Sequence, residues 1–202
     1  SGSPASETWD GSSWTEITEM NTVRWAGGSA GADTESFIAF GGNINTTATE
    51  TWNGSAWTEV SDMNLARHAL AGSGSQTAAI GFGGNVSGPP YKSETEVWNG
   101  SSWTEVSDLN QNRTDVGGAG SSTAALAFGG TITPPRTAKT ESWDGSSWTE
   151  VADLATDKAS GAGQRGTSAS NTSTLYAGGK VPSYTTATEE WSFSGLNPAT
   201  TP

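Results

Sequence analysis

The feature that most constrains this chain is a motif that recurs about every 45 residues. The motif reads Glu-x-Trp-(Asn/Asp)-Gly-Ser-(Ser/Ala)-Trp-Thr-Glu; it occurs in full four times, and a degenerate fifth copy starts at Glu189. Its first Trp lies at position 9, 52, 98, 143 or 191, so successive copies are 43, 46, 45 and 48 residues apart. Periods in this range are typical of propeller blades and exceed the roughly 33 or 34 residues of ankyrin and tetratricopeptide repeats. The repeat therefore predicts an array of similar small sheets.

Each copy of the motif is predicted to form a β-hairpin around an Asn-Gly or Asp-Gly pair. Such pairs favour a two-residue type I′ loop, because both central residues of that loop need a positive φ. With Asn53 and Gly54 as the loop, Trp52 would pair with Ser55, and Trp57 would lie diagonal to Trp52 on the same face. The two indoles are thus expected to stack together between neighbouring units.

Two further strands are predicted upstream of each hairpin. Short apolar runs that end in Gly-Gly, such as 78–82 and 124–128, indicate buried strands. Segments rich in Gly and Ala, such as 69–74 and 117–120, precede these runs and suit an innermost strand, where large side chains would be crowded. Each unit is therefore expected to be a four-stranded blade with the Trp-containing hairpin as its outer half.

These elements resemble those of the Kelch-repeat family of β-propellers, whose blades carry a double glycine after the second strand and a Trp in the fourth. The matching residues are Gly41-Gly42, Gly83-Gly84, Gly129-Gly130 and Gly178-Gly179, together with Trp57, Trp103 and Trp148. The chain departs from the family in having Trp rather than Tyr in the third strand and a shorter outer hairpin. The Thr- and Ser-rich sequence of the repeats also resembles that of propeller segments in tail-fibre proteins of marine bacteriophages.

The fold is therefore expected to be all-β, a β-propeller of four-stranded Kelch-like blades over residues 1–194. Counting strands gives seventeen, and four blades need sixteen. The simplest closure lets the N-terminal hairpin complete the blade that the last inner strand pair begins, which hides open sheet edges. The alternative is five blades, incomplete at both termini and completed by another chain. Residues 195–202 are expected to be a C-terminal tail that leads to an absent domain.

Composition excludes several chemistries. The chain has no Cys and a single His, His68, which rules out disulfides, thiolate zinc sites, a cysteine nucleophile and multi-histidine metal sites. The nine Lys and Arg are scattered in a chain of pI about 4.3, so a nucleic-acid partner is not expected. No apolar run approaches the ~20 residues of a membrane span, so membrane insertion is not expected either. We expect no cofactor, no metal and no catalytic residues.

One cation recurs ten residues after the fourth-strand Trp of every unit, as Arg24, Arg67, Arg113 or Lys158. An identical position in each repeat favours a structural role for this cation. Its predicted partner is a repeated carboxylate such as Asp62 or Asp108, held in a shielded ion pair.

The function expected from these observations is that of a non-enzymatic binding or structural module. The resemblance to phage fibres implies a virion protein, extracellular or on the virion surface, that contacts cell-surface glycans or other virion proteins. The alternative is the propeller domain of a glycan-processing enzyme of the sialidase type. The Asp-Gly-Ser-Ser-Trp turns resemble sialidase Asp-boxes but are one residue too short, and even true Asp-boxes are structural.

The binding face is predicted from loop variation. The segment between Gly-Gly and the Glu of the third-strand motif has seven, eleven, ten and nine residues in successive units, whereas the other connections barely differ. The predicted binding residues on this face are Tyr91, Lys92, Arg136, Lys139, Lys180 and Tyr184. Their rings would stack on a sugar or a side chain, and their cations would donate to hydroxyl or acidic groups. The alternative is that these loops form a solvated rim with no ligand.

Overall fold

The computed structural model describes residues 3–42, 46–133, 135–160, 162–163, 172–180 and 183–192. Within these ranges the chain forms strands and turns, with no helix that could cross a membrane. The strands are β1 (Ser6–Trp9), β2 (Trp14–Ile17), β3 (Gly28–Gly31), β4 (Phe37–Phe40), β5 (Thr49–Trp52), β6 (Trp57–Val60), β7 (Ala71–Ser75), β8 (Ala78–Phe82), β9 (Thr95–Trp98), β10 (Trp103–Val106), β11 (Gly117–Ser121), β12 (Ala124–Phe128), β13 (Thr140–Trp143), β14 (Trp148–Val151), β15 (Ala162–Gly163), β16 (Ser173–Ala177) and β17 (Thr188–Ser192). The expected tail at 195–202 lies outside the described residues.

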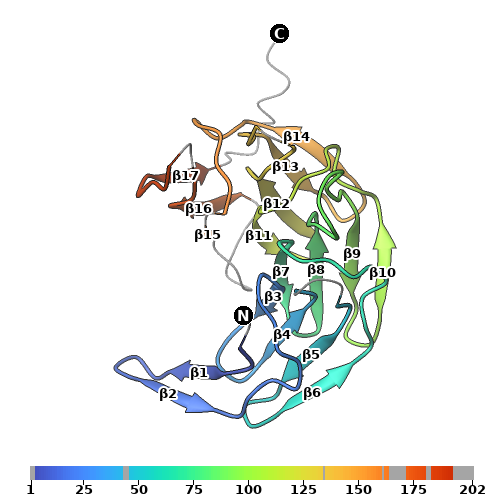
Figure 1. Cartoon of the computed structure of the whole chain (residues 1–202), viewed down its shortest axis with the longest axis vertical. Helices are drawn as coiled ribbons and strands as arrows, with labels where there is room; N and C mark the ends of the chain where they lie inside the picture. Colours follow the sequence, from blue (N-terminus) through green and yellow to red (C-terminus); the bar gives the residue numbers. More distant parts are fainter. Residues whose placement is uncertain are drawn as a thin grey trace.

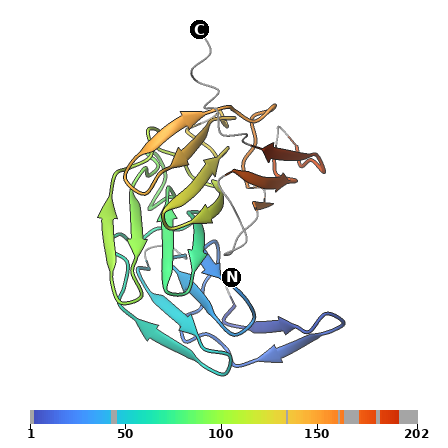
Figure 2. The ribbon, with the colours of Figure 1, turned by 180° about the vertical axis from the view of Figure 1, so that it is seen from behind.

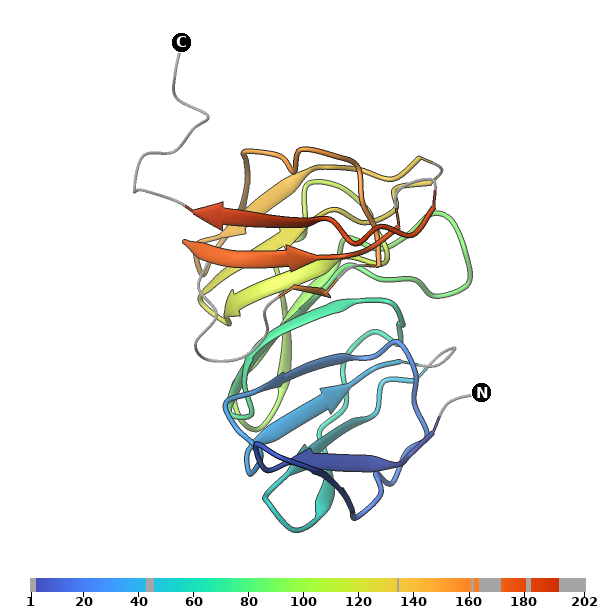
Figure 3. The same cartoon turned by 90° about the vertical axis from the view of Figure 1, so that its left-hand side faces the viewer.

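The strands form five antiparallel sheets that follow one another along an arc (Figure 1). Three sheets are complete four-stranded blades, β3–β6, β7–β10 and β11–β14, each with its strands in chain order. The sheet β15–β17 has three strands, and β1 and β2 form a separate hairpin. Figures 2 and 3 show the hairpin and the three-stranded sheet at opposite ends of the arc. The prediction of four-stranded blades is confirmed.

The innermost strands of neighbouring blades lie directly against each other, and glycine makes this approach possible. A Cβ added to Gly72 in β7 would lie 2.7 Å from the ring of Phe40 and 2.7 Å from the backbone nitrogen of Ser29 in β3. Real Cβ atoms do not approach other atoms so closely, so only Gly fits at this position. The Gly- and Ala-rich segments are therefore innermost strands, as the sequence predicts.

A backbone belt joins the blades next to these strands. Ala26, Ala69, Asp115 and Ser160 occupy the same place before successive inner strands and have positive φ values of 52°, 52°, 56° and 58°. The amide of Ala69 donates to the carbonyl of Ala26 at 2.7 Å, that of Asp115 to Ala69 at 2.9 Å, and that of Ser160 to Asp115 at 3.0 Å. Each blade is thus tied to the next by one hydrogen bond near the axis of the arc.

The outer hairpins differ from the predicted two-residue loop. Trp52 lies directly opposite Trp57, with ring centroids 5.5 Å apart, so the loop holds the four residues between them. The side-chain oxygen of Asn53 accepts hydrogen bonds from the amides of Ser55 and Ala56 at 3.0 and 2.9 Å. This side-chain cap allows a wider turn in which only the Gly needs a positive φ. The predicted diagonal pairing of the two indoles is therefore wrong, although they do contact each other.

The repeated cation also has a different partner from the one predicted. Arg67 is buried and pairs at 3.1 Å with Glu96 of the third strand of its blade, not with Asp62 or Asp108. Asn64 adds two hydrogen bonds to the same carboxylate, at 2.7 Å from its amide and 2.9 Å from its side chain. Arg24 pairs with Glu50, Arg113 with Glu141 and Lys158 with Glu189 in the same way. Because the third strand is buried, leaving its carboxylate without a partner would cost more free energy than leaving Asp62 or Asp108 without one.

The predicted closure by the N-terminal hairpin does not occur in this structure. In the described part of the chain β1 pairs only with β2, and β16 pairs with β15 and β17. The strand β17 carries the same Glu-x-Trp motif as β1 and follows β16 in the chain, so the loop that it closes is far shorter. Among the described residues the hairpin β1–β2 and the sheet β15–β17 are therefore separate sheets of two and three strands.

Candidate functional site

The positions just after the repeated cation break the repeat. The two residues there are Trp25 and Ala26 in the first complete blade, His68 and Ala69 in the second, Thr114 and Asp115 in the third, and Ala159 and Ser160 before β15. This segment pairs with the loop after Gly-Gly, through the bridges His68 to Asn85, Thr114 to Thr131 and Ala159 to Lys180. The residues that differ between blades are thus collected on the loop face, beside the axial belt.

Asp115 is the residue of this group with the most perturbed environment. Burial raises the pKa of the Asp115 carboxyl above its ordinary value. A side-chain hydrogen bond from Ser160 opposes this shift, and so do the charges of His68, Arg136 and Lys180. The charges of three basic side chains from three different loops therefore act on one carboxylate.

Two members of this charged group contact aromatic rings, His68 that of Trp25 and Lys180 that of Tyr184. We call the whole set the axial cluster: Trp25, His68, Asp115, Arg136, Lys180 and Tyr184. The rings of Trp25 and His68 have centroids 5.2 Å apart, and Trp25 is 45% exposed. The Nζ of Lys180 lies 5.6 Å from the ring centroid of Tyr184, which is 83% exposed. Among the described residues, the buried Nδ1 of His68 has no hydrogen-bond partner. The cluster thus offers exposed rings and both signs of charge on one face.

The axial cluster takes in half of the binding residues that the sequence predicts. Arg136, Lys180 and Tyr184 belong to it. Lys92 instead pairs with Glu94 at 3.2 Å, Lys139 pairs with Glu150 on the fourth strand, and Tyr91 is partly buried. Sequence reasoning missed Trp25 and Asp115, and it gave His68 no role. Comparison of the repeats position by position, rather than by loop length, would have found them.

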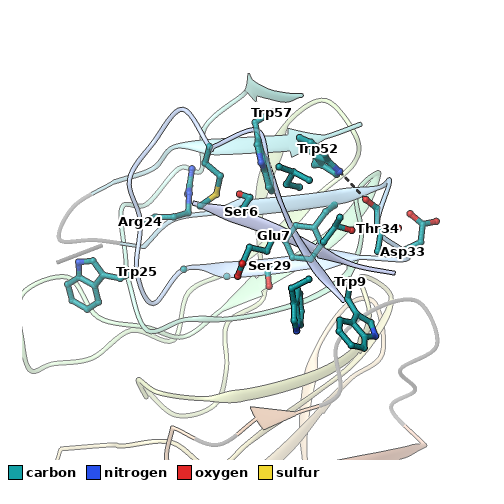
Figure 4. A pocket seen from close by; sticks show the side chains of 18 of the residues that line it. Ser6, Glu7, Trp9, Arg24, Trp25, Ser29, Asp33, Thr34, Trp52 and Trp57 are labelled. Atoms are coloured by element: carbon teal, nitrogen blue, oxygen red, sulfur yellow. Dashed lines mark hydrogen bonds between the residues drawn. The ribbon is translucent and has the colours of Figure 1, made fainter. Parts of the chain in front are cut away.

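A second feature is a cleft of about 530 Å³ between the N-terminal hairpin and the first complete blade (Figure 4). Trp9 and Trp14 of the hairpin line it, with 44% and 65% of their surfaces exposed. Trp57 faces them from the blade, and in the described structure its Nε1 has no hydrogen-bond partner. Gly28 and Phe37, from β3 and β4, are also among the lining residues.

The position of this cleft corresponds to the inner half of a blade. In complete blades an inner strand pair fills the space beside the outer hairpin, and its Phe packs on the fourth-strand Trp of the next blade. Phe40 contacts Trp103 in this way with centroids 4.7 Å apart, and Phe82 contacts Trp148 at 4.9 Å. Among the described residues no preceding blade supplies such a Phe to the hairpin β1–β2, so its indoles are exposed.

No group of three or more acidic or histidine side chains among the described residues could hold a metal ion. The carboxyl of Asp115 can accept hydrogen bonds from hydroxyl groups, and Arg136 and Lys180 can bind an anionic group.

Comparison with known proteins identifies the architecture. No family model matches the chain, and no curated protein matches it in sequence. Among solved structures, that of YjhT superposes with a TM-score of 0.69 at 16% sequence identity, over 87% of this chain and 66% of the YjhT chain. The fold is a Kelch-like β-propeller. The chain thus matches slightly less than two thirds of the YjhT propeller, and the likeness concerns the fold alone.

The same comparison corrects one expectation. YjhT is a sialic acid mutarotase, which is an enzyme. With an enzyme among the solved structures that share this propeller fold, the expectation that this chain is not an enzyme does not stand.

Proposed function

We propose that this propeller binds saccharides that carry an acidic group, and that the axial cluster is the binding site. The observation that carries the proposal is Asp115. Ala26, Ala69 and Ser160 occupy the equivalent place in the other units, so the fold does not require a carboxylate there. A partly buried charge costs stability, and residues that cost stability are retained where they bind or react.

The cluster has the groups that saccharide recognition needs. The exposed faces of Trp25 and Tyr184 suit the apolar face of a pyranose ring. The Asp115 carboxylate would accept hydrogen bonds from ring hydroxyls, while Arg136 and Lys180 would bind the carboxylate or sulfate of the sugar. Because these residues come from different blades, the site depends on the assembled propeller.

The experiment is a glycan array that contains sialylated, uronate-bearing, sulfated and neutral sugars, followed by calorimetric titration of the strongest binder. The double variant R136S/K180S should weaken binding at least tenfold, which corresponds to about 1.4 kcal/mol. The variant Lys139→Ser is the matched control, since this lysine pairs with Glu150 away from the cluster. Equal affinity of the double variant and the control would refute the axial site, and binding of neutral sugars alone would refute the acidic group.

A second candidate function is catalysis at the same site. A carboxyl whose pKa is raised by burial and which lies within the electrostatic influence of His68 can exchange a proton with a bound sugar. Proton NMR spectra of the bound glycans, recorded over time, would show turnover as new anomeric signals. The variant Asp115→Ala, which restores the residue of the first two blades, should abolish any such signal while it leaves the fold intact.

We also propose a location for this activity. The resemblance to phage tail fibres supports a place on a virion or another extracellular surface, where the glycan would belong to a host cell. Labelled propeller protein should then adhere to the host cells in proportion to their surface glycans, and treatment with glycosidases should remove it.

A further inference from the structure

The third-strand carboxylate is paired with a cation in every unit except the first. The pairs are Arg24 with Glu50, Arg67 with Glu96, Arg113 with Glu141, and Lys158 with Glu189. The corresponding residue of the N-terminal hairpin is Glu7, which lies opposite Glu16 in the register in which Glu50 lies opposite Glu59. Glu7 is exposed and has no ion-pair partner among the described residues. The hairpin thus leaves open to a ligand the carboxylate that three other units bind to a guanidinium.

Glu7 is one of the residues that line the cleft of about 530 Å³ beside the hairpin (Figure 4). In the described part of the chain, the other charged side chains of the lining are Asp33 and Arg24. Arg24 is bound to Glu50 at 2.7 Å, so its charge is already compensated. The cleft therefore has a surplus of negative charge, which favours a cationic ligand.

The rings that line the cleft suit a guanidinium in particular. Glu7 and Trp9 are two residues apart in β1 and so project from the same face, and Trp14 lies directly opposite Trp9. A guanidinium bound to Glu7 would lie within reach of these exposed indoles. Planar guanidinium groups stack on aromatic faces and also form paired hydrogen bonds with a carboxylate, which an ammonium group does less well.

The lining also contains an indole whose hydrogen bond is not satisfied. In the second and third complete blades the fourth-strand indole donates to a threonine hydroxyl, from Trp103 to Thr49 at 3.0 Å and from Trp148 to Thr95 at 3.1 Å. The equivalent Nε1 of Trp57 is buried and has no partner among the described residues. A carbonyl oxygen of a ligand in the cleft would accept this hydrogen bond.

We propose that this cleft binds an arginine residue of a partner polypeptide. Its guanidinium pairs with Glu7 and stacks on the indoles of Trp9 and Trp14, and a backbone carbonyl of the partner accepts the hydrogen bond from Trp57. Arginine combines the guanidinium and the carbonyl that these two groups require, and the fold itself pairs the equivalent carboxylate with an arginine residue in three units.

This proposal does not depend on the saccharide site. The cleft takes a cation, whereas the axial cluster is proposed to take an anionic sugar. Trp25 lines the cleft and also belongs to the cluster, but Arg136 and Lys180 are not among the lining residues. The double variant R136S/K180S should therefore bind an arginine ligand as the parent does, even if it loses a glycan.

The experiment compares three ligands by calorimetry and by the fluorescence of the indoles. N-acetylarginine methylamide represents an arginine residue within a polypeptide. Its citrulline counterpart has nearly the same shape but carries an uncharged urea group, and free arginine replaces the flanking carbonyl by a carboxylate. We expect the arginine peptide analogue to bind best, and its affinity to fall as the salt concentration rises.

Two variants test the assigned contacts. Glu7→Gln should weaken binding of the arginine analogue about tenfold, the loss expected for a hydrogen bond to a charged group. The matched control is Glu59→Gln, which removes the same charge from an exposed position outside the lining. Trp14→Ala should weaken binding severalfold, because it removes one of the stacking faces. Circular dichroism and melting temperature confirm that each variant is folded.

Four results would overturn the proposal. The first is equal binding of the citrulline analogue, which would show that the cleft does not select charge. The second is equal affinity of the Glu7→Gln and Glu59→Gln variants. The third is tighter binding of free arginine than of the peptide analogue, which would exclude a polypeptide partner. The fourth is the absence of both heat and fluorescence change at millimolar concentrations of the arginine analogue.

Discussion

The hairpin β9–β10 of the second complete blade and the N-terminal hairpin β1–β2 have nearly the same amino-acid sequence but different surroundings. Their Trp pairs have nearly the same geometry, with centroids 5.6 Å apart for Trp98 and Trp103 and 5.5 Å apart for Trp9 and Trp14. The first pair is 2% and 6% exposed, and the second is 44% and 65% exposed. The hairpin therefore sets the geometry of the pair, whereas the neighbouring blade sets its burial.

The carboxylates of the two hairpins show the same contrast. Glu96 is buried and receives hydrogen bonds from Arg67 and Asn64, which lie on the loop that enters its blade. Glu7 is exposed, and no such loop precedes it in the described structure. The stabilising contacts of a blade thus depend on the loop that enters it, and identical local sequence does not guarantee them.

The largest expected difference between the two hairpins is in the free energy of unfolding after loss of an indole. Trp103→Ala should cost about 3–5 kcal/mol, because it leaves a cavity against Phe40 and removes the hydrogen bond from the indole to Thr49. Trp14→Ala should cost less than about 1 kcal/mol, since a surface position loses little on truncation. Urea denaturation of both variants measures the two values. Equal losses would show that the N-terminal indoles are buried in solution.

The next comparison concerns the third-strand carboxylates, because substitution of Glu by Gln removes the charge and leaves the shape of the side chain nearly unchanged. Burial lowers the pKa of the Arg67 guanidinium, while the charge of Glu96 and its hydrogen bond act to raise it. The carboxylate of Glu96 therefore stabilises the charged form of Arg67. Glu96→Gln should destabilise the protein by about 1.5–3 kcal/mol, the range for hydrogen bonds to a charged group. Glu7→Gln should leave the unfolding curve unchanged. A loss at Glu7 comparable to that at Glu96 would contradict the exposed position of this residue.

A smaller effect, of opposite sign, is expected at the axial cluster. Burial raises the folded pKa of Asp115, so its ionised form is destabilising once the pH rises above the unfolded value of 3.8. Asp115→Ala should therefore raise the midpoint of urea unfolding at neutral pH, and this gain should vanish as the pH falls below 3.8. Ala26 and Ala69 adopt the same backbone conformation, which makes alanine a tolerated substitute. An unchanged or lower midpoint at neutral pH would show that Ser160 and the nearby cations offset the cost of burying the carboxylate, and would contradict the proposal that Asp115 is retained at a cost in stability.

Much of the fold follows from the sequence because its signals are local and repeated. The Trp spacing, the Gly-Gly pairs and the Gly-rich runs indicated the blade and its strand order, and the structure confirms them. The partner of Arg67 could not be inferred, because several carboxylates recur with the same period and only burial of the third strand selects Glu96. The partner of β16 could not be inferred either, because β1 and β17 carry equivalent motifs.

The smallest expected effect concerns the turns of the hairpins, where the chain uses Asn and Asp in the same position. Hydrogen bonds from the backbone and side chains of Ser147 and Ser146 lower the pKa of Asp144 to about 2, whereas Asn99 makes similar contacts without a titratable group. A lowered folded pKa means that the carboxylate stabilises the turn above the unfolded value of 3.8, and that this contribution is lost as the pH falls from 3.8 through about 2. Because Asp144 is exposed, the effect should be a slight change of slope. The variant Asp144→Asn should flatten the fall in stability across this window, and Asn99→Asp should steepen it. Parallel curves for all three proteins would show that the turn carboxylates contribute nothing to folding.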